Sequence, residues 1–102
     1  MILRMLPEAE AEQAHAARSL ERARTGHGLL FYDAYDTVME RAMQSPRMYA
    51  VAEDAPTGFE VREIYLAQFK YRIFYVLQDV ELVVVAVAYA GRRPGYWHSR
   101  LP

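Results

Sequence analysis

The segment from Phe59 to Tyr89 constrains the fold more than any other part of the chain, because it contains three strand-like runs in succession. The runs Phe59–Leu66, Phe69–Leu77 and Glu81–Tyr89 are rich in Val, Ile, Tyr and Phe, which pack well on a pleated sheet. The breaks between them are so short that only hairpin loops fit. The sequence therefore predicts an antiparallel meander of three strands.

Side-chain patterns predict how this meander is covered. The last run, LVVVAVA, shows almost no polar alternation, so we expect apolar cover on both of its faces and a central position. In the middle run, alternation places Tyr71 and Ile73 on one face and Lys70 and Arg72 on the other. Arg62 of the first run approaches this cationic pair only in some registers, and the sequence leaves the register open.

The N-terminal half predicts two helices. An apolar run, Met1–Leu6, suits an opening strand, and a helix is expected from Pro7 to about Arg24, with Pro at its first position. Paired glycines then break the pattern before a second helix, Leu29–Gln44, so the two helices should form an antiparallel hairpin. The expected buried face of the first helix is Ala9, Ala16, Ala17, Leu20 and Ala23. We therefore predict an α+β fold in one domain, 1–102, with the hairpin packed on a small antiparallel sheet.

Composition limits the kinds of site and the location. The chain has no cysteine, which excludes disulfides and thiolate metal sites and fits a reducing cytosol. We find no signal-peptide pattern and no apolar run long enough for a membrane span, so a soluble cytoplasmic protein is expected. The three histidines, His15, His27 and His98, lack metal-ligand spacing, and we predict neither a metal nor a cofactor.

Charge is uneven along the chain. Residues 1–58 carry six arginines against nine carboxylates, and residues 59–102 carry six basic residues against four acidic ones. The last twelve residues, 91–102, which we call the tail, contain three arginines and no acid. A basic end on a nearly neutral chain indicates a local contact with an acidic or anionic partner and argues against broad coating of nucleic acid.

Three parts of the sequence stand out together: Arg62, the segment KYRIFY at 70–75 and the segment RRPGYW at 92–97. In their order and spacing they resemble the RelE/ParE superfamily of toxins from type II toxin–antitoxin modules, and most closely its ParE-like members. The resemblance extends from about Ala9 to Leu101. One departure is Tyr89, where the family often has His, and it weakens any mechanism that needs a base there.

The resemblance implies a bacterial growth inhibitor held in check by a cognate antitoxin, and a hetero-oligomer of the two proteins is an expectation that follows from it. RelE-like members cut messenger RNA on the ribosome, whereas ParE-like members poison DNA gyrase by binding it. The ribonuclease reaction needs cations for the phosphorane and groups for proton transfer. The low-ranked catalytic candidates are Arg62, Lys70, Arg72, Tyr96 and His98.

Simpler structural roles compete with these candidates. Arg62 and Arg72 are expected more often to pair with neighbouring acids such as Glu60 and Glu63 than to act in catalysis. Trp97 suits either an interface anchor or a cap on the apolar sheet. The predicted target-binding residues are Arg92, Arg93, Tyr96, Trp97 and Arg100.

We thus predict a ParE-like toxin, a plasmid-stabilisation type of protein, that binds DNA gyrase without catalysis. The first alternative is a RelE-like ribonuclease whose partners are the ribosome and messenger RNA. The second is a non-toxic binding module of the same fold.

Overall fold

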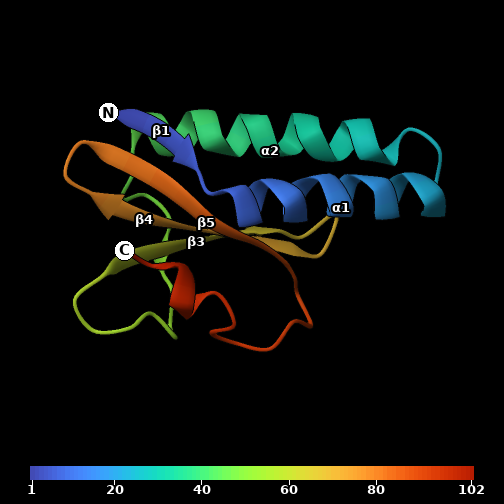
Figure 1. Cartoon of the computed structure of the whole chain (residues 1–102). Helices are drawn as coiled ribbons and strands as arrows, with labels where there is room; N and C mark the ends of the chain where they lie inside the picture. Colours follow the sequence, from blue (N-terminus) through green and yellow to red (C-terminus); the bar gives the residue numbers. More distant parts are fainter.

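A computed structural model describes residues 1–102 and shows two helices on one face of a five-stranded sheet (Figure 1). The connection before the third strand and the tail lie on the other side, so the sheet is the middle layer. The α+β arrangement and the helix hairpin predicted from the sequence are confirmed. In chain order the elements are β1 (Ile2–Met5), α1 (Pro7–Ala23), α2 (His27–Gln44), β2 (Ala50–Val51), β3 (Glu60–Leu66), β4 (Tyr71–Gln78), β5 (Glu81–Tyr89) and the 3₁₀ helix η1 (His98–Arg100).

The strands lie in the order β1-β5-β4-β3-β2. The meander is confirmed, because β3 pairs with β4 and β4 with β5, both antiparallel. However, β1 runs parallel to β5, with Ile2 opposite Glu81 and Met5 opposite Val84, so the sheet is mixed and not wholly antiparallel. A long connection lies between these two strands, and only such a connection allows parallel pairing.

The turn before β4 differs from the prediction. β4 begins at Tyr71, because Phe69 and Lys70 belong to the turn. Lys70 has a φ of 62°, in the left-handed region that strand residues do not adopt, and its N–H donates to the carbonyl of Leu66 at 2.8 Å. The expected place of Lys70 on a strand is therefore wrong.

The two helices approach each other closely near the loop that joins them. A Cβ at Gly28 would lie 2.8 Å from the carbonyl oxygen of Ala17, so glycine allows the two helices to approach there. Ala9, Ala16 and Ala17 are buried as expected, but Ala23 is exposed. The reason is visible in Figure 1, where the hairpin end of the helices extends past the sheet.

Two apolar cores lie on opposite faces of the sheet. Ile73 and Tyr75 of β4 face the helices, while Phe74 and Val76 face the side covered by the tail. β5 is buried from Leu82 to Ala88, which confirms the predicted cover on both faces. No helix combines the length and the apolar character needed to cross a membrane.

Candidate functional site

The sheet face opposite the helices carries a hollow of about 440 Å³, which we call the Arg72 groove. Residues from the connection after β2, from β3, β4 and β5, and from the tail line it. Its charges are balanced, because three guanidinium groups stand against three carboxylates. These charged residues are Arg72, Arg92, Arg93, Glu53, Asp54 and Glu63. The lining of the groove therefore carries no formal net charge.

Arg72 and Glu63 form the strand-borne part of this groove. The Nε of Arg72 lies 3.3 Å from Oε1 of Glu63, yet it is buried and makes no well-directed hydrogen bond. The guanidinium also lies 5.3 Å from the ring centroid of Tyr65, its partner across the strands. Burial raises the pKa of Glu63, against the opposing effect of Arg72, and Asp54 adds to the rise. The prediction that Arg72 pairs with a neighbouring acid is confirmed.

Trp97 anchors the tail to the sheet. Its ring stacks on Phe74 with centroids 4.8 Å apart, and only 1% of the residue is exposed. Of the two roles considered for Trp97, the structure shows the apolar cap. The ring is therefore held against the sheet, and the expected contact of Trp97 with a target stays a prediction.

A second anchor is a set of contacts to Glu12 of α1, which we call the Glu12 network. Its members are Glu12, Val85 and Val87 of β5, and Tyr96 and Arg100 of the tail. Arg100 donates to both carboxylate oxygens of Glu12, at 2.8 and 3.0 Å, and the hydroxyl of Tyr96 donates at 2.8 Å. The N–H of Val87 donates to Glu12 at 3.0 Å, and Arg100 donates to the carbonyl of Val85 at 3.0 Å. Tyr96 and Arg100, both predicted to bind a target, are thus engaged within the molecule.

Electrostatics stabilise the Glu12 network in its ionised form. Burial alone raises the pKa of Glu12, but hydrogen bonds from Arg100, Val87 and Tyr96 outweigh burial, and the pKa is lowered. The pKa of Tyr96 is raised, mainly by burial and then by its bond to Glu12. The carboxylate is therefore charged at neutral pH, and the phenol is a weaker acid than a free tyrosine.

Arg92 and Arg93 remain on the surface beside the groove. The guanidinium of Arg92 lies 3.9 Å from the ring centroid of Tyr96 and 3.8 Å from Glu12, and about half of its side chain is exposed. Arg93 is exposed and makes no ion pair or side-chain hydrogen bond. These are the tail cations that a partner can reach most readily.

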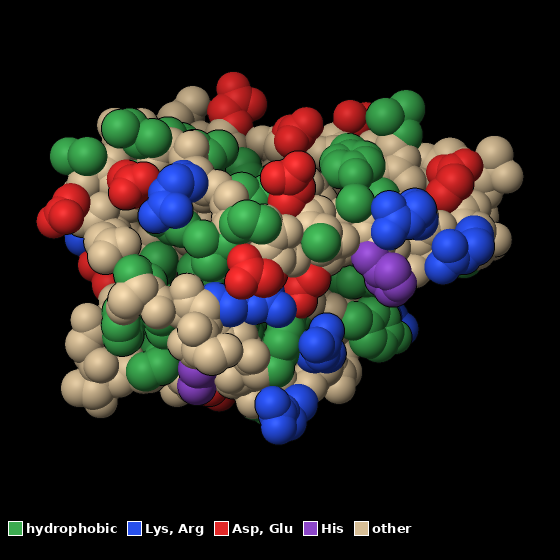
Figure 2. All heavy atoms as spheres, in the orientation of Figure 1, with side chains coloured by type: hydrophobic (Ala, Val, Ile, Leu, Met, Phe, Trp, Pro, Cys, Tyr) green, Lys and Arg blue, Asp and Glu red, His purple; other side chains and the backbone are tan.

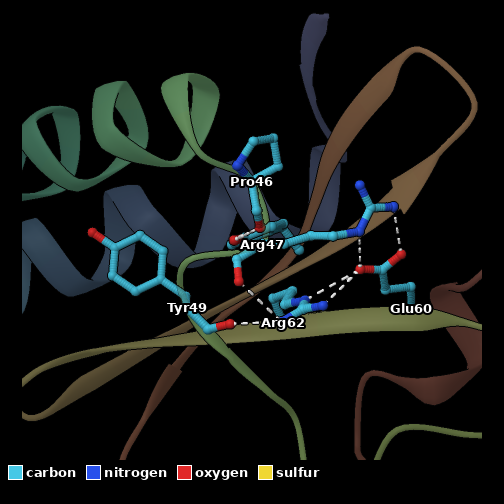
Figure 3. A network of polar contacts seen from close by, with 6 residues as sticks. Pro46, Arg47, Tyr49, Glu60 and Arg62 are labelled. Atoms are coloured by element: carbon cyan, nitrogen blue, oxygen red, sulfur yellow. Dashed lines mark hydrogen bonds and ion pairs between the residues drawn. The ribbon is translucent and has the colours of Figure 1, made fainter.

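Arg62 lies away from the groove, on the helix side of the sheet (Figure 3). It donates to Glu60 at 2.8 Å and to the carbonyl oxygens of Arg47 and Tyr49 at 3.3 and 3.0 Å. Arg47 binds the same carboxylate. Hydrogen bonds from Arg47, which has the larger effect, and from Arg62 lower the pKa of Glu60. Arg62 therefore holds the connection after α2, and the structure does not bring it together with Arg72.

The remaining catalytic candidates are also separate. Lys70 is exposed in the turn before β4, where its carbonyl accepts the N–H of Ala90 at 2.8 Å. The ring of His98 packs against Gly95 and stacks edge-on to Trp97, and its Nε2 lies 4.0 Å from Asp54 without a hydrogen bond. Of the five candidates only Arg72 and Tyr96 line the Arg72 groove.

A second hollow, of about 620 Å³, lies between α1 and the ends of β4 and β5, and we call it the α1 cleft. His15 and Arg18 of α1 line it together with Tyr71. Tyr89 and Arg92 line both hollows, so the two surfaces meet there. Figure 2 shows acidic side chains over the helix layer and basic ones over the tail and the hairpin end of α1.

Comparison with known proteins bears on the fold of the chain. No family model matches the sequence, and no curated protein is significantly similar to it. Among solved structures, the isolated E. coli RelE toxin superposes with a TM-score of 0.59 at 22% identity, covering 97% of this chain and 94% of that one. The chain has a RelE-like fold. At this level of identity the likeness extends to the fold alone, and it confirms the layer order expected from the sequence.

Sequence reasoning missed two site residues of this RelE-like fold. Nothing in the sequence around Glu12 predicts a site role, yet its carboxylate is the main acceptor for the tail. The sequence predicts Glu63 as a partner of an arginine, but no sequence pattern indicates its partial burial in the groove or its raised pKa. The only signal for Glu12 was indirect, since a tail with three arginines and no acid needs a carboxylate from elsewhere.

Proposed function

We propose that this chain is the toxin of a type II toxin–antitoxin module and that it arrests growth by binding DNA gyrase, as ParE-like toxins do. The RelE-like fold supports the toxin assignment, and the resemblance of the RRPGYW segment supports the ParE-like mode of action. The tail is then the part of the molecule that contacts the target.

The observation that carries this proposal is that the tail is packed on the sheet with two arginines exposed and its tyrosine hydroxyl hydrogen-bonded. Arg92 and Arg93 are exposed beside the groove, whereas the hydroxyl of Tyr96 is held by Glu12 and its pKa is raised. A phenol in this state is a poor proton donor. The tail therefore offers charged contacts on a fixed support, which suits recognition better than proton transfer.

An antitoxin is the second expected partner. β1 is an edge strand, and Ile2 and Leu3 on it are 58% and 46% exposed. An extended antitoxin segment can pair with such an edge and cover these side chains. We therefore propose a toxin–antitoxin complex in which the added strand lies next to β1.

A ribonuclease is the second candidate, because of the pair Glu63 and Arg72. A partly buried carboxylate with a raised pKa is suited to take a 2′-hydroxyl proton, and an adjacent guanidinium is suited to bind the phosphate. The fold of the RelE toxin is compatible with this alternative. Its partners would be the ribosome and messenger RNA.

Controlled expression in bacteria without an antitoxin separates the two candidates. Gyrase poisoning should give filamentous cells and DNA-damage signalling while bulk messenger RNA stays intact. Rapid cleavage of ribosome-bound transcripts would favour the ribonuclease. Normal growth at high soluble expression would contradict both and leave a non-toxic binding module.

Two sets of variants then locate the active surface. Arg92→Ala with Arg93→Ala should abolish toxicity while leaving the fold intact; Arg22→Ala with Arg24→Ala, which removes two exposed charges at the hairpin end, is the matched control. Glu63→Gln should leave a gyrase binder toxic but should reduce ribonuclease activity by roughly 10²-fold or more. Full toxicity of the Arg92/Arg93 variant would move the target-binding surface away from the tail.

A further inference from the structure

β5 is longer than β1, the strand that pairs with its outer edge. β1 pairs with β5 only from Glu81 to Val84, whereas β5 continues to Tyr89. The register with β4 also shifts at this point, so that Val85 has no partner residue across the strands. Such a bulge next to an open edge leaves backbone groups without partners from the sheet.

Beyond the end of β1, two side chains bind the backbone groups of β5 that a neighbouring strand would otherwise bind. The carboxylate of Glu12 accepts the N–H of Val87, and the guanidinium of Arg100 donates to the carbonyl of Val85. The two side chains also bind each other through two hydrogen bonds. A charge-assisted pair of this kind has a fixed geometry, and here it joins the tail to the sheet edge.

Glu12 also fixes the position of Arg92, through its hydrogen bond with Tyr96. It accepts the hydroxyl of Tyr96, and the ring of Tyr96 supports the guanidinium of Arg92 at 3.9 Å. Arg93 follows Arg92 directly, and its side chain makes no ion pair or hydrogen bond. The tail has no acid, so the countercharge for its arginines in this contact comes from α1 alone.

We propose that Glu12 is a positioning residue: its carboxylate docks the tail on the open edge of β5 and thereby sets how Arg92 and Arg93 are presented. The functional consequence rests on the proposed function, whereas the docking itself does not. The competing explanation is that the stack of Trp97 on Phe74 holds the tail without help from Glu12.

Trp97 is the only tryptophan of the chain, so its fluorescence reports on docking. Glu12→Gln keeps the size of the side chain and removes its charge. Glu10→Gln is the control, because Glu10 is exposed on the same helix and makes no ion pair or side-chain hydrogen bond. For Glu12→Gln we expect red-shifted Trp97 emission, several-fold stronger acrylamide quenching and at least about tenfold faster amide exchange at Val87. Amides of β3 and β4 should exchange as in the wild type, which shows that the change is local.

Wild-type emission, quenching and Val87 exchange in folded Glu12→Gln would overturn the proposal and leave the Trp97 stack as the anchor. If Glu12→Gln does not fold, the milder Arg100→Lys replaces it, since it keeps the charge but loses the two-pronged contact. This variant should show the same changes to a smaller degree, and its full identity with the wild type would equally overturn the proposal.

Growth assays of the same variants test the functional consequence. Glu12→Gln should lose toxicity although Arg92 and Arg93 are present, and Glu10→Gln should keep it. A released tail with full toxicity would refute the positioning role. If the wild-type chain is not toxic, the proposed function fails, but the fluorescence and exchange results still decide whether Glu12 docks the tail.

Discussion

Arg62 and Arg100 are exposed to a similar small degree, but Arg62 binds an acid close to it in the sequence and Arg100 binds one far from it. Their side chains are 16% and 15% exposed, and each binds a glutamate and backbone carbonyl oxygens. Arg62 binds Glu60, two residues away on the same strand, whereas Arg100 binds Glu12, 88 residues away. The first arginine therefore fixes a local connection, and the second joins the two ends of the chain.

The two networks also differ in how much each depends on a single arginine. Glu60 keeps two hydrogen bonds from Arg47 if Arg62 is lost. Glu12 has no comparable second guanidinium, because Arg92 lies 3.8 Å away and mainly stacks on Tyr96. The long-range contact is the one without a substitute, and the following experiments test that difference from the largest expected effect to the smallest.

The largest effect is expected for Trp97→Ala. Removing a buried large aromatic side chain should lower the free energy of unfolding by about 3 to 5 kcal/mol. Chemical denaturation measures this loss, and Val80→Ala, at an exposed position in a turn, is the control. A loss near zero would mean that the polar contacts of Arg100 hold the tail alone.

Arg100→Ala should destabilise the chain more than Arg62→Ala. Loss of Arg100 leaves the partly buried carboxylate of Glu12 short of donors, at a cost of about 1 to 3 kcal/mol, whereas Glu60 retains Arg47. Thermal and denaturant unfolding of both variants side by side provide the measurement. Equal losses, or a larger loss for Arg62→Ala, would break the comparison.

The Glu12 network should weaken in acid. Since the pKa of Glu12 is lower in the folded than in the unfolded chain, its contribution is fully present above the unfolded pKa of about 4.3. It is lost as the pH falls below that value through the folded pKa. The difference in unfolding free energy between wild type and Glu12→Gln, measured from pH 6 downwards, isolates this carboxylate from Glu60, whose pKa is also lowered. A difference independent of pH would contradict the ionised state of Glu12.

The smallest effect is expected for Tyr96→Phe. It removes one of the donors to Glu12 but keeps the ring that supports Arg92, so the loss should be about 0.5 to 1.5 kcal/mol. Tyr32→Phe, which removes a hydroxyl that makes no hydrogen bond, serves as the control in the same unfolding assay. If Tyr96→Phe lowered the free energy of unfolding as much as Arg100→Ala, the hydroxyl of Tyr96 would be as important to the Glu12 network as the guanidinium of Arg100.

The same contrast explains how much the sequence could predict. The meander, the helix hairpin and an acid partner for Arg62 depend on residues close in sequence, where periodicity and spacing carry information. The parallel pairing of β1 with β5 and the Glu12 network depend on contacts across nearly the whole chain. A single sequence does not encode such pairings in any local pattern. For Trp97 the composition of the tail left two roles open, and only the packing on Phe74 decided between them.

The parallel pairing of β1 with β5 affects when the sheet can form during synthesis of the chain. During synthesis Ile2 emerges first, but its partner Glu81 is made 79 residues later. At about 5 to 20 residues per second, that interval is roughly 4 to 16 s. Throughout it β1 lacks its partner strand, so this edge of the sheet forms only after β5 has been made.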